Sequence, residues 1–360
     1  MKIEIYFSLV FIYLILIGGT VEAATIIVGE NSQANYIMIQ EAINNAKDGD
    51  TILVHSGTYT ENLVVNRSVS IKSNSNNPKD TVVQAANSGK HIFNITEDNV
   101  TISGFNITGA NVFRKSPTAG VHIEEVNNSI ISYNEFSNNV VGIDLHNSNN
   151  NVLENNIASA NYRGISLTNS NGNDLINNDV FNNHFGIYFW GSKNNVLSGN
   201  NASLNEEDGI WIEDDSSNNT LSNNMISNSD CGISLTEFSN NSIIAHNIVN
   251  SNLIGIEISG SSSNIVKNNS LSDNRRIGIS IIRDSVNNTV KDNSLSNNSK
   301  GITAEDTDNQ IYNTNNQIYN NEIKKSEIQN SDASQIPFTG PTLIIIIFGM
   351  ICAFIRKKQL

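Results

Sequence analysis

The chain repeats one short pattern of apolar and polar residues along most of its length. A glycine followed by two apolar residues, with a polar or aromatic residue between them, returns every 22 or 23 residues. Because alternate side chains of a strand lie on opposite faces, each copy predicts a short strand with one buried and one outward face. The glycines that begin these strands are Gly120, Gly142, Gly164, Gly186, Gly209, Gly232, Gly255, Gly278 and Gly301.

A second pattern, Asn-x-apolar-x-x-Asn-x-apolar-x-x-Asn, follows each glycine strand. It predicts two further short strands joined by turns, because asparagine tolerates left-handed backbone and forms local hydrogen bonds. The first asparagine column contains Asn151, Asn173, Asn195, Asn219, Asn241, Asn264 and Asn288, and the second contains Asn156, Asn178, Asn200, Asn224, His246, Asn269 and Asn293. The apolar columns contain Leu153, Leu175, Leu197, Leu221, Ile243, Val266 and Val290, and then Ala158, Val180, Ala202, Ile226, Ile248, Leu271 and Leu295.

Strands this short, without helices between them, cannot each bury an apolar face alone. Stacked in parallel, every coil buries the apolar column of the next coil, and repeated asparagines can form hydrogen-bonded ladders along the axis. The repeat therefore predicts a parallel β-solenoid with three short strands in each coil of 22 or 23 residues.

These units resemble the right-handed parallel β-helix repeats of the pectate-lyase-like superfamily, and most of all those of its NosD-like subgroup. The resemblance covers about Ile37 to Ile323. It implies an all-β, right-handed parallel β-helix and a link with carbohydrate-binding and sugar-hydrolase domains.

The residues ahead of the regular units predict a short capping helix. Ile39, Ala42, Ile43 and Ala46 follow helical spacing, and the stretch "KDGD" is expected to end the helix at Gly49. The open end of a solenoid exposes unpaired strand groups, so a cap is physically required there.

The first 23 residues are typical of a signal peptide. Lys2 supplies a basic start, an apolar run extends from Ile5 to Ile17, and Ala23 ends a small-residue cleavage signal. The mature chain is then expected to begin at Ala24, with the β-helix in residues 24–325. An uncleaved membrane anchor is the alternative.

The C-terminal residues predict a membrane anchor or a sorting tail. Residues 326–336 form a polar linker, and residues 337–360 contain the apolar stretch Leu343 to Ile355 ahead of three basic residues. Such a stretch is long enough to span a membrane marginally, with its basic end inside. The β-helix would then face outward.

The stretch "IPFTG" resembles the LPxTG sorting signal of sortase-anchored surface proteins, and the layout also resembles the archaeal tripartite sorting tail. Either resemblance implies that the span is removed and the protein is fixed to wall or lipid. An ordinary single-span anchor is the alternative. The motif consists of Ile336, Pro337, Phe338, Thr339 and Gly340.

The net charge and the cysteine content bear on nucleic-acid binding and on disulfide formation. The formal net charge of −14 argues against a nucleic-acid-binding surface. Cys231 lies in the repeat and Cys352 in the terminal apolar segment, so no structural disulfide is expected. We expect a monomeric solenoid held together by its core and its backbone ladders.

Bulky aromatic residues gather on the outward face of two adjacent glycine strands. Tyr188 and Trp190 occupy the second and fourth positions after Gly186, and Trp211 and Glu213 occupy the same positions after Gly209. Aromatic faces beside carboxylates and hydroxyls suit stacking against sugar rings. The alternative is ordinary strand propensity, since exposed aromatic residues pair well across ladders.

The stretch "GIDLH" resembles the Gly-Phe-Asp-Pro-His signature of mannuronan C5-epimerases, which implies catalytic roles for Asp144 and His146. Leu145 replaces the proline, and Val141 stands where those enzymes have a tyrosine. Proton abstraction beside a uronate carboxylate also needs a proton donor and a cation. His122, one coil below, and Lys115 or Arg114 are the candidates, since no basic residue occupies the outward strand positions themselves.

We expect no metal or cofactor. The NosD-like resemblance is associated with copper handling, but copper favours clustered His, Met or Cys, and only His122 and His146 share a face. A calcium site is the alternative, through oxygen ligands of an acidic cluster without fixed spacing. That cluster comprises Glu206, Glu207, Asp208, Glu213, Asp214 and Asp215.

The sequence thus predicts an exported, surface-anchored β-helix protein with a non-catalytic envelope or glycan-binding role. Its expected partners are a polysaccharide or cell-envelope glycan and the membrane. The alternative is a polysaccharide-active enzyme of the uronan lyase or C5-epimerase type around His122 and His146. Uniform coils favour the first, because active sites are usually built on longer loops, and the irregular stretch Gly109 to Thr118 keeps the second open.

Overall fold

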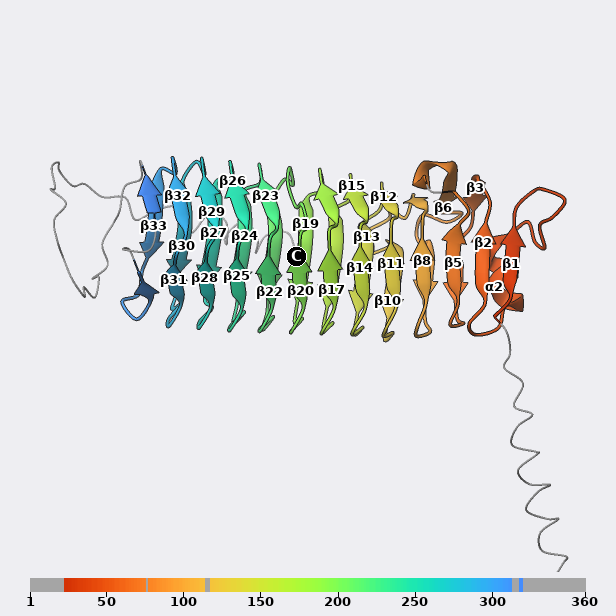
Figure 1. The fold of residues 1–360 in the computed structure, drawn as a ribbon, viewed down its shortest axis with the longest axis horizontal. Coiled ribbons are helices and arrows are strands. Elements are labelled where there is room, and N and C mark those ends of the chain that lie inside the picture. The colour runs from red at the N-terminus through yellow and green to blue at the C-terminus, as the bar shows by residue number, and fades with distance from the viewer. Residues whose placement is uncertain (1–22, 76, 114–116, 313–316, 320–360) are drawn as a thin grey trace, which may run out of the picture. The chain divides into compact units, whose positions relative to one another are not determined.

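The computed structural model of the chain describes residues 23–75, 77–113, 117–312 and 317–319. These residues form a parallel β-solenoid whose coils stack along one axis (Figure 1). Each regular coil contributes one strand to each of three sheets, and every strand pair is parallel. The prediction of three short strands per coil is confirmed.

The sheets differ in strand length. Sheet A follows the first asparagine position and contains β1 (Thr25–Val28), β2 (Thr51–Val54), β5 (Ser70–Ser73), β8 (Thr101–Ser103), β11 (Ile130–Ser132), β14 (Val152–Glu154), β17 (Asp174–Ile176), β20 (Val196–Ser198), β22 (Thr220–Ser222), β25 (Ile243–Ala245), β28 (Ile265–Lys267), β31 (Thr289–Lys291) and β34 (Gln310–Ile311). Sheet C carries the glycine strands and contains β4 (Leu63–Val65), β7 (Phe93–Ile95), β10 (Ala119–Glu124), β13 (Val141–His146), β16 (Arg163–Thr168), β19 (Phe185–Trp190), β21 (Asp208–Glu213), β24 (Cys231–Thr236), β27 (Ile254–Ser259), β30 (Ile277–Ile282) and β33 (Lys300–Ala304).

Sheet B follows the second asparagine position and has two parts. The first contains β3 (Gly57–Thr60), β6 (Thr81–Gln84), β9 (Asn106–Thr108), β12 (Glu135–Ser137), β15 (Ile157–Ser159) and β18 (Asp179–Phe181). The second contains β23 (Met225–Ser227), β26 (Ile248–Asn250), β29 (Ser270–Ser272), β32 (Ser294–Ser296) and β35 (Gln317–Tyr319). Between them Asn201 bridges to Asp179 and to Met225, so the face continues through that coil.

The core is one continuous apolar cluster along the inside of the coils. Ile143 and Leu145 of sheet C, and Leu153 of sheet A, are fully buried and repeat in each coil. The glycine strands approach their neighbours closely. A Cβ atom on Gly232 would lie 2.6 Å from the carbonyl oxygen of Gly255, closer than real Cβ atoms come. Glycine is required there by space.

Buried amide ladders join the coils at their turns. The backbone N and the Nδ2 of Asn156 both donate to Oδ1 of Asn178, each at 3.0 Å. Asn178 donates in the same way to Asn200, at 2.9 Å for both bonds, and its Nδ2 also reaches the carbonyl of Leu153 at 2.8 Å. The predicted ladders are therefore present, and their members are buried.

One coil of the predicted columns is shifted by one residue. Ser242 and Asn247, not Asn241 and His246, continue the ladders after Gly232. Asn241 and His246 instead occupy turn corners with positive φ, at 57° and 59°.

The same shift moves two apolar residues out of the core. Ile244 and Val249 are fully buried, whereas Ile243 is half-buried and Ile248 is 48% exposed. Gly232 lies ten residues before its ladder residue, as Gly209 and Gly278 do, and Asn241 stands one residue too early. Because strand side chains alternate with period two, a column aligned on Asn241 instead of Ser242 exchanges the two faces.

The N-terminal cap is α2 (Ile39–Asn45), which packs against β1, β2 and β4. Ile39, Ala42 and Ile43 are buried as predicted, but the helix ends at Asn45, before the expected Gly49, because Ala46 is extended. The carboxylate of Glu61 accepts from the backbone N atoms of Ile39 and Gln40, at 2.9 and 3.0 Å, and so satisfies the first turn.

The predicted signal peptide, linker, sorting motif and C-terminal span lie outside the described residues. Within the part of the chain that the structure describes, no helix combines the length and apolar character needed to cross a membrane.

Replacing Asn178 by alanine should lower the free energy of unfolding by about 2–4 kcal/mol, because the backbone N and Nδ2 of Asn156 and the carbonyl of Leu153 lose their partner inside the core. Chemical denaturation followed by circular dichroism measures the change. The neighbouring Asn177→Ala, at an exposed corner with φ of 53°, is the matched control and should cost about 1 kcal/mol. Equal effects of the two substitutions would contradict the role of the ladder.

Candidate functional site

The outward residues of sheet C form two straight rows along the solenoid axis. Parallel pairing aligns the second residue after each glycine, and separately the fourth, from coil to coil, about 4.8 Å apart. The inner row contains His122, Asp144, Ser166, Tyr188 and Trp211, and the outer row contains Glu124, His146, Thr168, Trp190 and Glu213.

The two rows differ in accessibility. In the inner row His122, Asp144 and Tyr188 expose only 7%, 8% and 7% of their surface, although they point away from the core. In the outer row Glu124 is exposed, and Trp190 is 39% exposed. A ligand on this face would therefore meet the outer row first.

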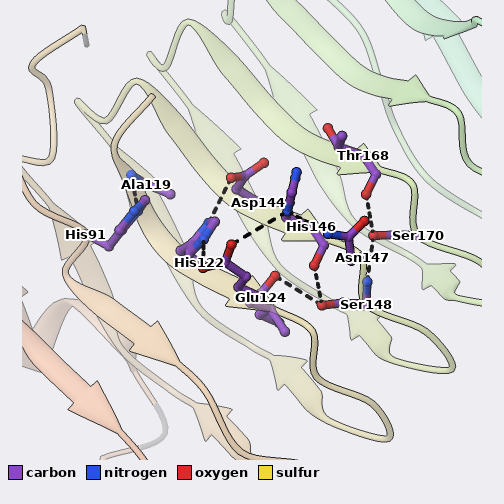
Figure 2. Close-up of polar contacts among 11 residues, drawn as sticks. His91, Ala119, His122, Glu124, Asp144, His146, Asn147, Ser148, Thr168 and Ser170 are labelled. Carbon is purple, nitrogen blue, oxygen red and sulfur yellow. Dashed lines mark hydrogen bonds and ion pairs between the residues drawn. The ribbon is translucent and has the colours of Figure 1, made fainter. Parts of the chain in front are cut away.

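Four of the titratable residues in these rows lie together. Figure 2 shows His122, Glu124, Asp144 and His146 on β10 and β13. Nδ1 of His122 lies 2.9 Å from Oδ2 of Asp144, and its Nε2 lies 3.7 Å from Oε2 of Glu124. The other oxygen of Glu124 lies 3.8 Å from Nδ1 of His146. The structure thus brings three catalytic candidates together, while Lys115 lies outside the described residues.

His91 is a fifth member that the sequence pattern did not predict. Its ring stacks on that of His122, with centroids 4.1 Å apart and planes inclined by 13°. Its Nδ1 accepts a hydrogen bond from the backbone N of Ala119 at 3.1 Å (Figure 2). His91 precedes the regular glycine repeat, so its alignment with β10 was not readable from spacing. We call His91, His122, Glu124, Asp144 and His146 the histidine cluster.

The pKa values of the two stacked histidines, His91 and His122, are shifted in opposite directions. Burial, and then the neighbouring His122, lower the pKa of His91 to about 4, so its ring is neutral at pH 7. Burial alone would also lower the pKa of His122. The hydrogen bond to Asp144, its charge and that of Glu124 outweigh burial and raise this pKa. The arrangement therefore favours the protonated form of His122, whose ring lies between the carboxylates of Asp144 and Glu124.

The aromatic candidates divide into an internal pair and an exposed ring. Tyr188 donates to Oε1 of Glu213 at 2.5 Å, and its ring meets the half-buried Trp211 edge-on, with centroids 5.1 Å apart. Nε1 of Trp211 donates to Thr236 at 3.0 Å. Burial, and then the charge and hydrogen bond of Glu213, raise the pKa of Tyr188, so its phenol stays protonated. Of the three rings, Trp190 is the one that offers a large accessible face.

A basic residue lies over this face, contrary to the sequence expectation. Arg163 begins β16, directly before Gly164, and its guanidinium carbon lies 4.1 Å from the ring centroid of Tyr188. The expectation that the strand face carries no basic group is therefore wrong. The second and fourth positions after each glycine carry no basic residue, but Arg163 reaches the inner row from the position before the glycine.

The described ends of the irregular stretch Gly109 to Thr118, residues 109–113 and 117–118, lie beside this edge of sheet C. Phe113 packs edge-on against Tyr162, with centroids 4.8 Å apart, and Tyr162 stacks on His184 at 4.8 Å. Arg114, the other candidate cation, lies outside the described residues. The described part of the stretch thus adds an aromatic contact ahead of β16.

Three of the six acidic residues proposed for calcium are held by separate partners. Oε2 of Glu206 lies 2.8 Å from Nδ1 of His184, and Asp215 pairs with Lys193 at 2.6 Å. Glu213 accepts from Tyr188. Among the described residues, no group of three or more His, Cys, Asp or Glu side chains is arranged to hold a metal ion.

Comparison with known proteins identifies the family. A family model described as "Periplasmic copper-binding protein (NosD)" matches residues 43–230 and 181–329. The chain belongs to the NosD family. The resemblance of its repeats to this subgroup is thereby confirmed.

The cell surface glycoprotein of Methanothermus fervidus is 33% identical to this chain over 138 residues. These residues are 38% of this chain and 21% of the relative, so the chain matches about a fifth of the relative's length.

Solved structures similar to this NosD-family chain are parallel β-helices. The A-module of the mannuronan C-5 epimerase AlgE6 of Azotobacter vinelandii superimposes with a TM-score of 0.62 at 16% identity, covering 79% of this chain and 94% of that one. PfbA, a surface adhesin of Streptococcus pneumoniae, gives a TM-score of 0.60 at 15% identity, with 78% and 87% covered. The fold is the predicted right-handed parallel β-helix, and at these identities the likeness extends to the fold alone.

The family description names copper, and the histidine cluster does not fit a copper site. His91 and His122 are stacked face to face, so their in-plane nitrogen lone pairs cannot converge on one ion. The Nδ1 atoms are also engaged, one with the backbone N of Ala119 and one with Asp144.

Asp144→Asn should lower the pKa of His122, because the charge that opposes burial is removed. NMR titration of the imidazole signals measures the shift. The raised pKa stabilises the fold while His122 is charged, so the stability advantage of wild type should be largest between about pH 4 and 6.5 and shrink as pH rises through the folded-state pKa.

Glu206→Gln, which alters the exposed partner of His184, is the control and should leave the titration of His122 in place. An unchanged His122 pKa in Asp144→Asn would show that the pair does not set the charge of this ring.

Proposed function

We propose that this NosD-family chain is a surface-displayed β-helix protein that binds glycan, without catalysis, on the outer face of sheet C. The observation that carries the proposal is the accessible ring of Trp190, 39% exposed in the outer row. Its register partners on the adjacent coils are Thr168 and Glu213. An aromatic face flanked by a hydroxyl and a carboxylate suits a sugar ring, whose faces are apolar and whose edge carries hydroxyls.

The regular stacking of sheet C supports an extended ligand. The outer row continues from Glu124 through His146 to Thr168 and Trp190, one residue per coil. A polymer lying along the axis would therefore meet a new polar or aromatic side chain at every strand spacing. A polysaccharide chain, with hydroxyl groups repeated along its length, fits this arrangement.

The proposed location is the cell surface. Support comes from the relative named as a cell surface glycoprotein and from the sequence expectations for both termini. A signal peptide in residues 1–23 would export the chain, and the tail in residues 337–360 would anchor it or be exchanged for another anchor. The β-helix, taken as residues 24–325, would then be displayed outside.

Trp190→Ala should weaken glycan binding by about ten-fold or more, because loss of a central tryptophan contact usually costs over 1 kcal/mol. The full-length chain is screened on an array of neutral and acidic polysaccharides, and the strongest ligand is titrated by affinity electrophoresis.

Tyr133→Ala is the matched control, because Tyr133 is 57% exposed and lies at the turn between sheets A and B, away from sheet C. An equal loss in both variants, or unchanged binding in Trp190→Ala, would argue against the proposed face. Failure of wild type to bind any glycan would leave a structural role in the envelope.

A second candidate, a uronan lyase or C5-epimerase, is favoured by one observation. His122 and Asp144 form a 2.9 Å pair on the outer face, next to His146. Removing a proton beside a uronate carboxylate requires a base and a proton donor, and a carboxylate–histidine pair can supply both. The fold is compatible with this chemistry and with adhesion, since similar structures include a mannuronan C-5 epimerase and a surface adhesin.

Under the proposed function, incubation with polyuronates in D2O should give neither an unsaturated product in the ultraviolet nor deuterium at carbon 5 by NMR. Catalysis would give one of these, because both reactions begin with removal of that proton. Product that disappears in Asp144→Asn but persists in Glu206→Gln would overturn the non-catalytic assignment.

A further inference from the structure

The guanidinium of Arg163 is held on the outer face of sheet C without an acceptor among the described residues. Its carbon lies 4.1 Å from the ring centroid of Tyr188 and 6.0 Å from that of Tyr162. Among the described residues no carboxylate forms an ion pair with it, and its buried Nε has no hydrogen-bond partner. The residue is half-buried, so part of it is reachable from solvent.

Among the described residues, no hydrogen bond or ion pair uses the terminal Nη donors of this group. Arginine carries five N–H donors in the plane of its guanidinium, and stacking on an aromatic ring uses the face of that plane. The donors at the edge match the two oxygens of a carboxylate in a bidentate fork. An arginine that already lies over an aromatic ring, half-buried and without an ion-pair partner among the described residues, is arranged to receive an anionic group.

The platform beneath Arg163 is held in place. The Tyr188 hydroxyl is anchored by Glu213, and the edge-on contact with Trp211 holds its ring from the next coil. Because the ring cannot swing freely, the arginine stacked on it is pre-organised, which lowers the entropy lost on binding.

A diagonal contact between coils explains why Arg163 reaches the inner row. Arg163 lies against Tyr188 of the next coil, as Phe185 lies against Trp211 and His91 lies against His122.

Side chains without large rings separate the Arg163–Tyr188 contact from the His122–Asp144 pair. The intervening positions are Ala119 and Val141 on one side and Ser166 in the inner row. No bulky side chain therefore stands between Arg163 and the His122–Asp144 pair at these positions.

We propose that Arg163 binds the carboxylate of a uronic-acid residue, so that the ligand on sheet C is an acidic glycan. This inference rests on the proposed glycan-binding function and names its ligand class. The net charge of −14 disfavours general adsorption of polyanions. A preference for the acidic polymer would therefore arise from the guanidinium of Arg163 and not from the net charge of the chain.

The test compares one polymer in two forms. Affinity of the full-length chain is measured for polygalacturonate and polymannuronate and for the same polymers with their carboxyl groups reduced to neutral alcohols. Wild type should prefer the acidic form by about ten-fold or more, the range expected for a hydrogen-bonded charge pair. Arg163→Gln should abolish that preference while still binding the reduced polymer, and Arg163→Lys should restore only part of it.

Lys193→Gln is the matched charge control, since Lys193 pairs with Asp215 and not with the aromatic platform. A similar loss of preference in this variant would assign the effect to net charge and overturn the inference. Tighter binding of a sulfated neutral glycan than of either polyuronate would overturn the carboxylate assignment.

The failures of the two proposals are distinguishable. If wild type binds the acidic and the reduced polymers with equal affinity, the role of Arg163 is overturned. If Trp190→Ala then loses binding to both polymers, the proposed glycan-binding function stands. Absence of binding to every polymer would overturn both. Thermal unfolding of Arg163→Gln, followed by circular dichroism, establishes that the variant retains its coils.

Discussion

Buried asparagine amides determine how one coil sits on the next. In the ladder through Asn156, Asn178 and Asn200, each side-chain oxygen accepts two N–H groups of the preceding coil, and the Nδ2 group donates to a carbonyl of that coil. Every turn would otherwise bury unpaired backbone groups, which is costly. A slip of one residue would break these bonds and also turn the core residues outward. The ladders and the core therefore enforce the same register.

This register aligns the outward side chains of sheet C into continuous rows. Because the coils are aligned residue by residue, one backbone position carries histidine, aspartate, serine, tyrosine and tryptophan in turn along the inner row. The scaffold stays constant while the outward chemistry changes. Substitutions in the rows can alter what the face binds at little cost to the core, which lies on the other side of the same strands.

The polar chemistry of this face depends on contacts between neighbouring coils. His122 is paired with Asp144 one coil above and stacked on His91 one coil below, and these contacts push the pKa values of the two rings apart. Arg163 reaches Tyr188 by the same diagonal relation. Each pair joins residues 22 to 31 positions apart in the chain. Isolated strands would possess none of these properties.

Periodicity alone was enough to predict the solenoid, its three strands per coil, its apolar columns and its asparagine ladders, since a repeat of fixed length can bury its apolar residues only by stacking. The spacing of Ile39, Ala42 and Ile43 likewise predicted the capping helix. In the coil of Gly232, Asn241 and Ser242 are adjacent candidates for the ladder, and the periodicity predicted Asn241. Ser242 is the residue that meets the coils on either side. The stacking of His91 and the placement of Arg163 were decided only by the tertiary structure, because they depend on the direction of side chains between coils and not on spacing within one.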